Sequence, residues 1–306
     1  MYSDIRTILY DATKNHYAVI ATSAINMETA RGIVSAATDK RAPIIFLLGQ
    51  NMMRRHANAE LMMPIIRTLA DNTPVPVAVC LDHGSDPERI MYAFRNGFSS
   101  IMVDGSLSVY EENVAMTKMY VDLCHQFGMG IEGELGHVGV AANGDEKDES
   151  LYTKVDDAVD FVKRTGVDCL AIAVGTAHGE YPKGFIPHIN FERIKEIKAA
   201  TGGIPLALHG GSGSGDDNIR KAVDAGINKV NVVTDVLNRA TAYCREVLGQ
   251  CSKISFLDVM SGMEDAVRQY VSHWIDLTGS EGKSQDFSFP NHMDSLSRKQ
   301  GIGVSE

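Results

Sequence analysis

The amino-acid sequence predicts an α/β protein folded as a TIM (β/α)8 barrel. Apolar runs of strand length recur eight times between residues 17 and 234, and segments of helical period separate them. The runs are apolar on both faces, which is typical of parallel strands covered by helices. A doubly wound sheet is the alternative, but it usually has fewer strands, and no GxGxxG motif follows the first apolar run.

The expected strands and helices alternate in order along the chain. Each expected strand is rich in apolar residues, and several expected helices end in glycine, the usual helix stop. The strands are expected at residues 17–24, 42–49, 75–83, 99–106, 130–138, 169–179, 205–213 and 227–234. Helices are expected at residues 27–40, 86–97, 109–128, 155–166, 190–202 and 216–226.

One catalytic barrel domain with C-terminal helices is expected over residues 1–278, because no linker or low-complexity tract interrupts them. Residues 279–306 are polar, rich in glycine and serine, and without a helical or strand period. This tail would be either a disordered end or an arm laid on a neighbouring subunit.

The composition narrows the possible partners and the cellular compartment. The net charge of −10 and the pI of about 5.5 argue against a nucleic-acid or anionic-membrane surface. The first residues carry no basic stretch and no long apolar run, so neither a signal peptide nor a membrane span is expected. Five cysteines, an odd number without a CxxC motif, indicate free thiols in a reducing cytoplasm.

Three histidines lie at the ends of three different expected strands. In a TIM barrel, catalytic groups come from the C-terminal strand ends, so His83, His178 and His209 should converge at one mouth. Three neutral imidazoles plus an oxygen ligand are a typical donor set for Zn²⁺ or a similar divalent ion. Glu134 is the candidate fourth ligand, although an ion pair with a lysine inside the barrel fits its spacing equally well.

The pair Asp82–His83 poses a geometrical problem. Adjacent residues of a regular strand point to opposite faces, so both side chains cannot face the mouth. At least one is therefore expected to lie past the strand end, where Gly84 would let the chain bend.

Two neighbouring loops are candidates for an anion site. Four glycines occur between residues 210 and 215, and Asn231 and Thr234 lead into a further helix. The loops after strands seven and eight are the usual phosphate site of this barrel, and helix N-termini supply free N–H donors. The glycines alone would also be compatible with a tight turn.

The loop after the fifth expected strand, residues 139–154, is long and acidic. It is either a solvated surface loop or a mobile lid that carries a general base into the site. Its acids are Asp145, Glu146, Asp148 and Glu149.

The motifs LDHG, DGS, EGELG, VGTAHG, LHGGSG and KVNVVT, in this order and spacing, resemble those of the class II, zinc-dependent ketose-bisphosphate aldolases. Fructose- and tagatose-bisphosphate aldolases are familiar members. The resemblance extends from residue 1 to about residue 275. It implies that His83, His178, His209 and Glu134 bind the catalytic zinc, and that Asp82 protonates the aldehyde oxygen.

The resemblance also implies a phosphate site for dihydroxyacetone phosphate, often beside a monovalent cation such as Na⁺ or K⁺. Asp104 matches a family aspartate near the metal and is counted with the metal residues. Ser23 stands where many members carry asparagine and is counted with the substrate-binding residues. The phosphate-binding residues implied are Gly179, Gly210, Gly211, Ser212, Asn231, Val232, Val233 and Thr234.

Three departures from the family pattern bear on the substrate and the base. Tagatose-type members often carry a second histidine where this chain has Gly84. The Gly-Gly-x-Glu-Asp run of the family loop is absent, so the base stays open among the four loop acids, with Glu146 and Glu149 as the predicted catalytic residues. No arginine matches the one that binds the second phosphate, so the aldehyde half either lacks that phosphate or is longer or differently charged.

The sequence therefore predicts a class II aldolase that reversibly cleaves a phosphorylated ketose to dihydroxyacetone phosphate and an aldehyde, in a homodimer or homotetramer. The alternative is a non-catalytic sugar-phosphate-binding protein or a partner subunit of another aldolase, which should have lost a metal ligand or the acid. A Schiff-base aldolase would need a lysine at a C-terminal strand end, whereas Lys229 lies near the start of the eighth expected strand. A barrel-type zinc hydrolase would carry His-x-His after strand one, which is absent here.

Overall fold

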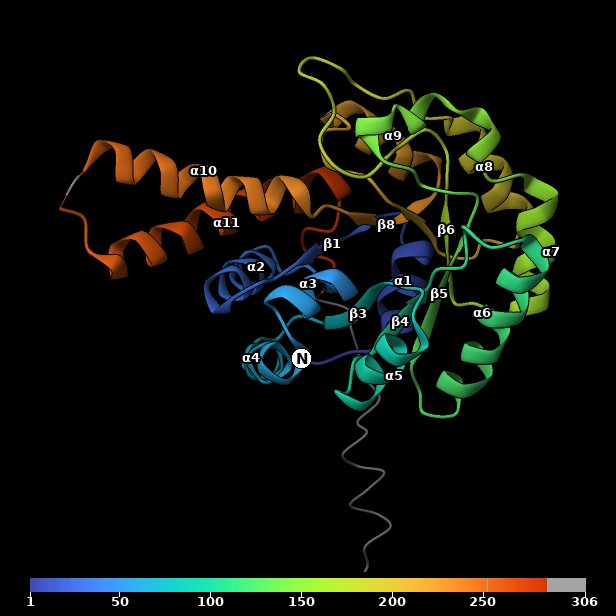
Figure 1. Cartoon of the computed structure of the whole chain (residues 1–306), viewed down its shortest axis with the longest axis horizontal. Coiled ribbons are helices and arrows are strands. Elements are labelled where there is room, and N and C mark those ends of the chain that lie inside the picture. Colours follow the sequence, from blue (N-terminus) through green and yellow to red (C-terminus); the bar gives the residue numbers. More distant parts are fainter. Residues whose placement is uncertain (252, 285–306) are drawn as a thin grey trace, which may run out of the picture.

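The computed structural model describes residues 1–251 and 253–284, and in it eight parallel strands form a closed barrel (Figure 1). The strands follow one another around the barrel in chain order, and the first pairs with the last. The predicted TIM barrel is therefore confirmed, and a doubly wound sheet is excluded because this sheet is closed. The strands are β1 Val19–Ser23, β2 Ile44–Gly49, β3 Val77–Gly84, β4 Ser100–Val103, β5 Gly130–Leu135, β6 Cys169–Ile172, β7 Leu206–Leu208 and β8 Ile227–Asn231.

Most strands end earlier than the apolar runs that predicted them. β6 ends six residues before His178, and β7 ends directly before His209. Loops at the C-terminal ends of the strands therefore carry most of the polar residues of interest.

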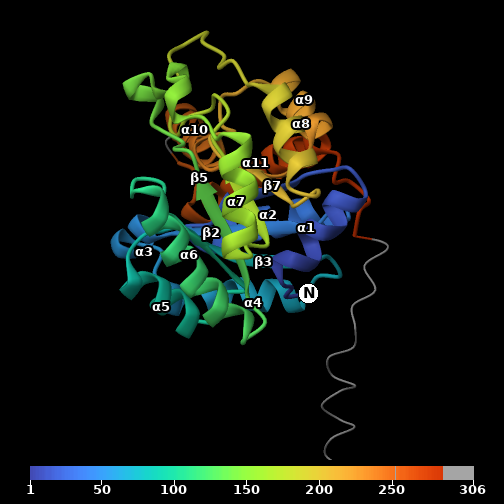
Figure 2. The ribbon, with the colours of Figure 1, turned by 90° about the vertical axis from the view of Figure 1, so that its right-hand side faces the viewer.

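Among the described residues, α-helices surround the barrel at the six places for which ranges were predicted, and other α-helices lie before, between and after them. The segments α6 and α7 lie side by side outside the barrel (Figure 2). The expected helices are α2 Met27–Asp39, α5 Pro87–Arg95, α6 Tyr110–His125, α7 Val155–Thr165, α8 Phe191–Ala200 and α9 Asp216–Ala225. The others are α1 Ile5–Lys14, α3 Gln50–Arg55, α4 Ala59–Asp71 and the expected C-terminal helices, α10 Thr234–Gln250 and α11 Phe256–Thr278.

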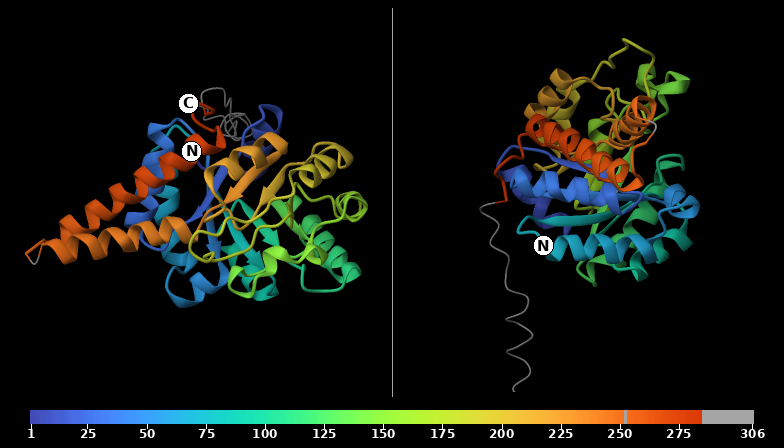
Figure 3. Two further views of the ribbon diagram at one scale, coloured as in Figure 1. Left: turned by 90° about the horizontal axis from the view of Figure 1, so that it is seen from above. Right: turned by 90° about the vertical axis from the view of Figure 1, so that its left-hand side faces the viewer.

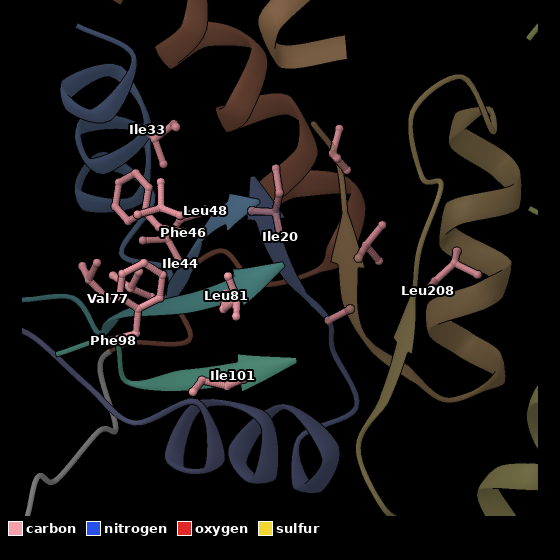
Figure 4. Packing of buried hydrophobic residues seen from close by; sticks show 14 of the residues in the cluster. Ile20, Ile33, Ile44, Phe46, Leu48, Val77, Leu81, Phe98, Ile101 and Leu208 are labelled. Atoms are coloured by element: carbon pink, nitrogen blue, oxygen red, sulfur yellow. The ribbon is translucent and has the colours of Figure 1, made fainter. Parts of the chain in front are cut away.

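Two layers of apolar side chains follow from the two-residue period of the strands. In β2, Phe46 and Leu48 face outward and pack near Ile33 of α2 (Figure 4). The alternate residues Ile45 and Leu47 belong to a separate cluster inside the barrel. This alternation is the reason why the strand sequences read as apolar on both faces.

The helix α1 closes the N-terminal end of the barrel. Asp4 caps it by accepting a hydrogen bond from the Arg6 backbone N–H. Ile5, Ile8 and Leu9, spaced along one helical face, are buried in the interior cluster. The end that stays open to solvent is therefore the end at which the strands finish.

The helices α10 and α11 form a hairpin that projects from the barrel (Figures 1 and 3). Where α11 packs along α2, a Cβ atom at Gly32 would lie 2.6 Å from the Glu264 carbonyl oxygen, so glycine is needed for this close approach. Leu248, Phe256 and Leu257 at the ends of these helices are exposed.

The predicted tail begins beyond α11. Gly282 and Ser284 donate backbone hydrogen bonds to the Lys40 and Arg41 carbonyls at the turn after α2. Residues 285–306 lie outside the described residues. Within the described part of the chain, no helix combines the length and the apolar character that a membrane span requires.

Candidate active site

The three strand-end histidines meet at the open end of the barrel. The ring centroids of His83 lie 4.8 Å from His178 and 4.9 Å from His209, and those of His178 and His209 are 5.7 Å apart. One ring nitrogen from each residue lies within 4.8 Å of the others. Three imidazoles from three different strand ends are therefore brought to one point, as predicted.

A bulge in β3 resolves the problem posed by Asp82 and His83. Leu81 pairs with Ile101 and Gly84 with Val103, so β3 contains one more residue than β4 over this stretch. His83 takes up the bulge with a φ of 52°. Both residues therefore remain within β3, and the expectation that one lies past the strand end is wrong.

Gly84 has a different role from the expected bend. A Cβ atom at this position would lie 2.7 Å from both the Leu81 Cδ2 atom and the Met102 carbonyl oxygen. Glycine is therefore needed for space behind the bulge, while the unusual backbone angle is taken by His83.

Hydrogen bonds orient two of the three rings. His83 Nδ1 lies 2.7 Å from Asp104 Oδ2, and His209 Nε2 lies 2.8 Å from Glu132 Oε1. Because carboxylates only accept, these nitrogens carry hydrogen. In the neutral rings the lone pairs then lie on His83 Nε2 and His209 Nδ1, which are 3.2 Å apart. His178 Nε2 is buried and has no hydrogen-bond partner among the described residues.

An ion pair lies directly beneath the cluster. Lys229 Nζ contacts Glu132 Oε2 at 2.9 Å, and both side chains are 0% exposed. Lys229 Nζ also donates to Asn231 Oδ1 at 2.7 Å. The ammonium group therefore lies nearer the mouth than the position of Lys229 near the start of the strand indicated. The barrel lysine considered as a partner for Glu134 therefore pairs with Glu132, two residues earlier on the same strand face.

Glu134 and Asp104 lie at the other edge of the His83 ring. Glu134 Oε2 is 3.6 Å from His83 Nδ1, the nitrogen that also faces Asp104. These residues form a second possible ligand group that shares only His83 with the three-histidine group. Since the two groups use opposite ring nitrogens, the structure does not bring all five predicted metal residues to one point.

The electrostatics of the cluster favour a bound cation. Burial alone would lower the pKa of His83, but the charges of Asp82, Asp104 and Glu134 raise it to about 10. Burial, assisted by the charges of His83 and His209, lowers the pKa of His178 to about 2. Burial raises the pKa of Glu134 to about 8, with Asp104 adding to the shift. The carboxylates therefore favour positive charge beside His83, and the neutral His178 keeps a lone pair, which together suit a metal ion.

A small pocket adjoins the histidines and gathers most of the predicted phosphate residues. Asn231 joins the predicted phosphate residues to the predicted proton donor, because its Nδ2 atom donates to Asp82 Oδ1 at 3.3 Å. The helix α10 begins at its edge, where the Asp235 N–H donates to Ser212 Oγ at 3.1 Å. The lining residues are Asp82, His178, Gly179, Gly210, Ser212, Asn231, Val233 and Thr234.

Three predicted substrate residues do not line this pocket. A Cβ atom at Gly211 would lie 2.8 Å from the Asn231 carbonyl oxygen, so this glycine lets the loops after β7 and β8 pack closely. The Val232 side chain is buried in the outer hydrophobic core. Ser23 ends β1, and its buried hydroxyl has no partner among the described residues.

The acids of the loop after β5 have different environments. Asp145 accepts a hydrogen bond from the Val140 N–H at 2.7 Å, and Asp148 accepts from the Ser150 N–H at 2.9 Å, so both hold turns of the loop. Glu149 is exposed. Glu146 is 5% exposed, and one of its carboxylate oxygens is buried without a partner among the described residues.

Sequence reasoning missed four polar residues that the structure connects to the cluster. Glu132 lies two residues before Glu134, and Lys229 lies two residues before Asn231, so each pair shares one strand face. This spacing could have identified Glu132 and Lys229 as inward-facing residues. Ser106 and His137 carried no such signal, since both follow strand ends by a few residues. The missed residues are Glu132, Lys229, Ser106 and His137.

Comparison with known proteins agrees with this geometry. Residues 3–283 match the family model of "Fructose-bisphosphate aldolase class-II". A sulfofructosephosphate aldolase from Alkalicoccus urumqiensis is 36% identical over 94% of this chain and 99% of its own length. A fructose-bisphosphate aldolase from Thermus caldophilus is 36% identical over 90% of this chain and 98% of its own length.

A solved structure is similar over nearly the whole chain. The crystal structure of the YdjI aldolase from Escherichia coli K12 superimposes with a TM-score of 0.83 at 34% identity, covering 93% of this chain and all of that chain. The chain therefore belongs to the class II fructose-bisphosphate aldolase family, whose members are aldehyde-lyases that carry out a metal-dependent aldol cleavage.

Proposed function

We propose that the open end of this barrel catalyses the reversible aldol reaction between dihydroxyacetone phosphate and an aldehyde. The observation that carries the proposal is the juxtaposition of three imidazoles with the pocket lined by His178, Asp82 and the predicted phosphate residues. The proposal extends to residues 1–278 acting as one catalytic domain.

His83, His178 and His209 are the proposed ligands of a divalent ion, zinc or a similar metal. The donor set fits this ion, because the neutral rings of His83 and His209 have their lone pairs on the nitrogens that face each other, and the buried His178 Nε2 has no partner among the described residues. When bound, the ion supplies a Lewis acid that draws electron density from the substrate carbonyl. Asp104 and Glu132 orient the rings, and Glu134 adds negative charge at the edge of His83.

The phosphate of the substrate is proposed to bind in the pocket beside α10. Gly179 and Gly210 have positive φ values of 95° and 67°, which turn the backbone there, and α10 begins with N–H groups that have no intrahelical acceptor. Ser212 and Thr234 offer hydroxyl groups at the same pocket. A monovalent cation, Na⁺ or K⁺, is part of this proposal on the strength of the family resemblance.

Asp82 is the proposed proton donor to the aldehyde oxygen. Its carboxyl lines the pocket next to His178, and Asn231 Nδ2 holds Oδ1 at 3.3 Å. This position lies between the phosphate residues and β2, where Gly49 pairs with Asp82 and leaves open space beside it. An aldehyde that enters there would present its oxygen to Asp82.

The predicted base, Glu146 or Glu149, would require movement of the loop. Glu146 is buried within the loop, and Glu149 is exposed on it. Either carboxylate would have to be carried to the substrate by a rearrangement of residues 139–154.

Location and assembly belong to the same proposal. The five cysteines are free, which supports a reducing cytoplasm. The apolar side chains of Leu248, Phe256 and Leu257 on the hairpin support a homodimer or homotetramer that covers them.

The test is a panel of aldehydes, each mixed with dihydroxyacetone phosphate and metal-loaded protein, with product masses measured. Relatives are named for different sugars, fructose bisphosphate and sulfofructose phosphate, so uncharged, phosphorylated and sulfonated aldehydes all belong in the panel. A new ketose phosphate with at least one aldehyde supports the proposal. Binding of dihydroxyacetone phosphate without any product would favour the alternative of a non-catalytic sugar-phosphate binder.

A further inference from the structure

Two reciprocal hydrogen bonds tie the loop after β7 to the first turn of α10. The Asp235 N–H donates to Ser212 Oγ at 3.1 Å, and the Gly213 N–H donates to Asp235 Oδ2 at 3.0 Å. Each segment therefore supplies one backbone donor and one side-chain acceptor to the other. The arrangement resembles a capping box, except that it joins two distant segments of the chain instead of two residues of one helical turn.

The residue before α10 explains why this helix depends on another loop. Val233 is the N-cap of α10, and its aliphatic side chain cannot accept a hydrogen bond from the first turn. The Asp235 N–H is one of the donors that find no acceptor within the helix, and Ser212 supplies that acceptor. The Tyr270 hydroxyl of α11 lies 3.3 Å from Asp235 Oδ2, so this carboxylate is held from a second side.

The backbone N–H groups around the pocket fall into two groups. The first group donates to acceptors of the protein itself and consists of Gly211, Gly213, Ser214 and Asp235. The second group has no acceptor within residues 1–251 and 253–284, belongs to residues that line the pocket, and consists of Gly179, Gly210, Ser212 and Val233. The occupied donors hold the two loops together, and the free donors remain for an anion.

The bond from Asp235 also fixes the role of the Ser212 hydroxyl group. A backbone N–H can only donate, so Ser212 Oγ is the acceptor in this contact. The hydroxyl hydrogen is not used there, and it has no acceptor in the part of the chain that the structure describes. Ser212 is 5% exposed and lines the pocket. Its hydrogen is therefore available to an oxygen of a bound phosphate.

We propose that Asp235 is a positioning residue for the phosphate of dihydroxyacetone phosphate, an inference that rests on the proposed aldolase function. Its carboxylate holds the Gly213 N–H, and with it the turn that carries Ser212. A carboxylate beside a phosphate site repels the ligand, so the charge of Asp235 opposes binding while its hydrogen bond supports binding. A neutral acceptor at the same place should therefore serve as well as the carboxylate.

The test compares Asp235→Ala and Asp235→Asn with the wild type on metal-loaded protein. KM and kcat are measured for exchange of one C3 hydrogen of dihydroxyacetone phosphate for solvent deuterium. Alanine removes the acceptor, so KM should rise by about 10- to 100-fold, the range for a hydrogen bond to a charged group, while kcat stays within about threefold. Asparagine keeps an oxygen that can accept from the Gly213 N–H and lacks the charge, so its KM should equal the wild-type value or fall below it.

Inorganic phosphate separates an effect on the phosphate from an effect on the rest of the substrate. Its inhibition constant against dihydroxyacetone phosphate should rise in Asp235→Ala by the same factor as KM, and it should not rise in Asp235→Asn. The matched control is Asp217→Ala, because Asp217 is likewise the second residue of a helix, α9, and its exposed side chain contacts Arg220 of that helix. This variant should keep the KM and the inhibition constant of the wild type.

The outcomes separate this inference from the proposed function. If the wild type shows no metal-dependent exchange, the aldolase proposal itself fails, and the calorimetric affinity of the same variants for inorganic phosphate then tests Asp235 by itself. If the wild type exchanges and Asp235→Ala keeps its KM within about threefold, Asp235 does not position the phosphate.

The asparagine variant decides the question even if the alanine variant does not fold. A KM at or below the wild-type value supports the inference. A KM raised about 10-fold or more in Asp235→Asn overturns it, because the charge and not the hydrogen bond would then be required.

Discussion

Replacing Lys229 with methionine should destabilise the protein strongly, because it leaves the buried Glu132 carboxylate without its cation. Lys229 Nζ lies 3.1 Å and 2.9 Å from the two Glu132 oxygens, and neither residue is exposed. Removing one partner of a buried ion pair typically costs about 3–5 kcal/mol. Such a loss is a large share of the roughly 5–15 kcal/mol by which proteins are stable.

The assay is urea unfolding of the metal-free protein at neutral pH, with Lys229→Met compared with the double variant Lys229→Met/Glu132→Gln. The double variant has no unpaired charge, and glutamine can still accept the hydrogen bond from His209 Nε2. It should recover most of the lost stability, because replacing both partners of a buried pair is often nearly neutral. A loss below about 1 kcal/mol in Lys229→Met, or an equal loss in both variants, would refute the assigned pairing.

The pH dependence gives a second check of the same pair. Burial would raise the pKa of Glu132, but Lys229 and His209 lower it to about 2. A carboxyl with a lowered pKa contributes stability above its ordinary value of 4.5, and the contribution is lost as the pH falls from 4.5 toward 2. The difference in stability between the wild type and Lys229→Met should therefore narrow over this range.

Three further substitutions test the other parts of the site. His178→Ala should reduce the bound metal to near zero after dialysis, whereas alanine at the exposed His188 should leave it unchanged; equal metal in both variants would contradict the ligand assignment. Asp82→Ala should lose cleavage by about 10²- to 10⁴-fold and keep its deuterium exchange, because only the aldehyde oxygen lacks its proton donor; an equal fall in both rates on metal-replete protein would show a different role. Gly211→Ala places a Cβ atom 2.8 Å from the Asn231 carbonyl oxygen and should raise the KM for dihydroxyacetone phosphate, while Gly249→Ala in α10, where the added atom meets nothing within 4 Å, should not.

Much of the fold and part of the site could be predicted because parallel strands bring their C-terminal ends together. The eight apolar runs were sufficient for the barrel, and the positions of His83, His178 and His209 in the C-terminal parts of three of them were sufficient for their convergence. The bounds of individual helices were harder to predict than the strand–helix alternation. No range was predicted for α4, the helix before β3, and Pro64 lies inside it.

The finer geometry could not be predicted, since it depends on depth within the barrel and on one unusual backbone angle. Glu132 and Glu134 both face inward and differ in their position along the barrel axis. Because of this difference, Glu132 contacts Lys229 and Glu134 contacts the edge of the His83 ring. A positive φ is rare for residues other than glycine, so the sequence favoured Gly84 for the bend that His83 provides. The link from Ser106 to His137 joins residues from two loops, and strand periodicity does not predict such contacts.

The most direct test of a metal-dependent reaction at the three histidines is deuterium exchange into dihydroxyacetone phosphate before and after metal removal. The account predicts that chelated and dialysed protein exchanges no C3 hydrogen above the rate without protein. Exchange should return as zinc is added and should level off at about one ion per chain, the number that a single three-histidine site can hold. Exchange in the metal-free protein at the rate of the loaded protein would contradict the account.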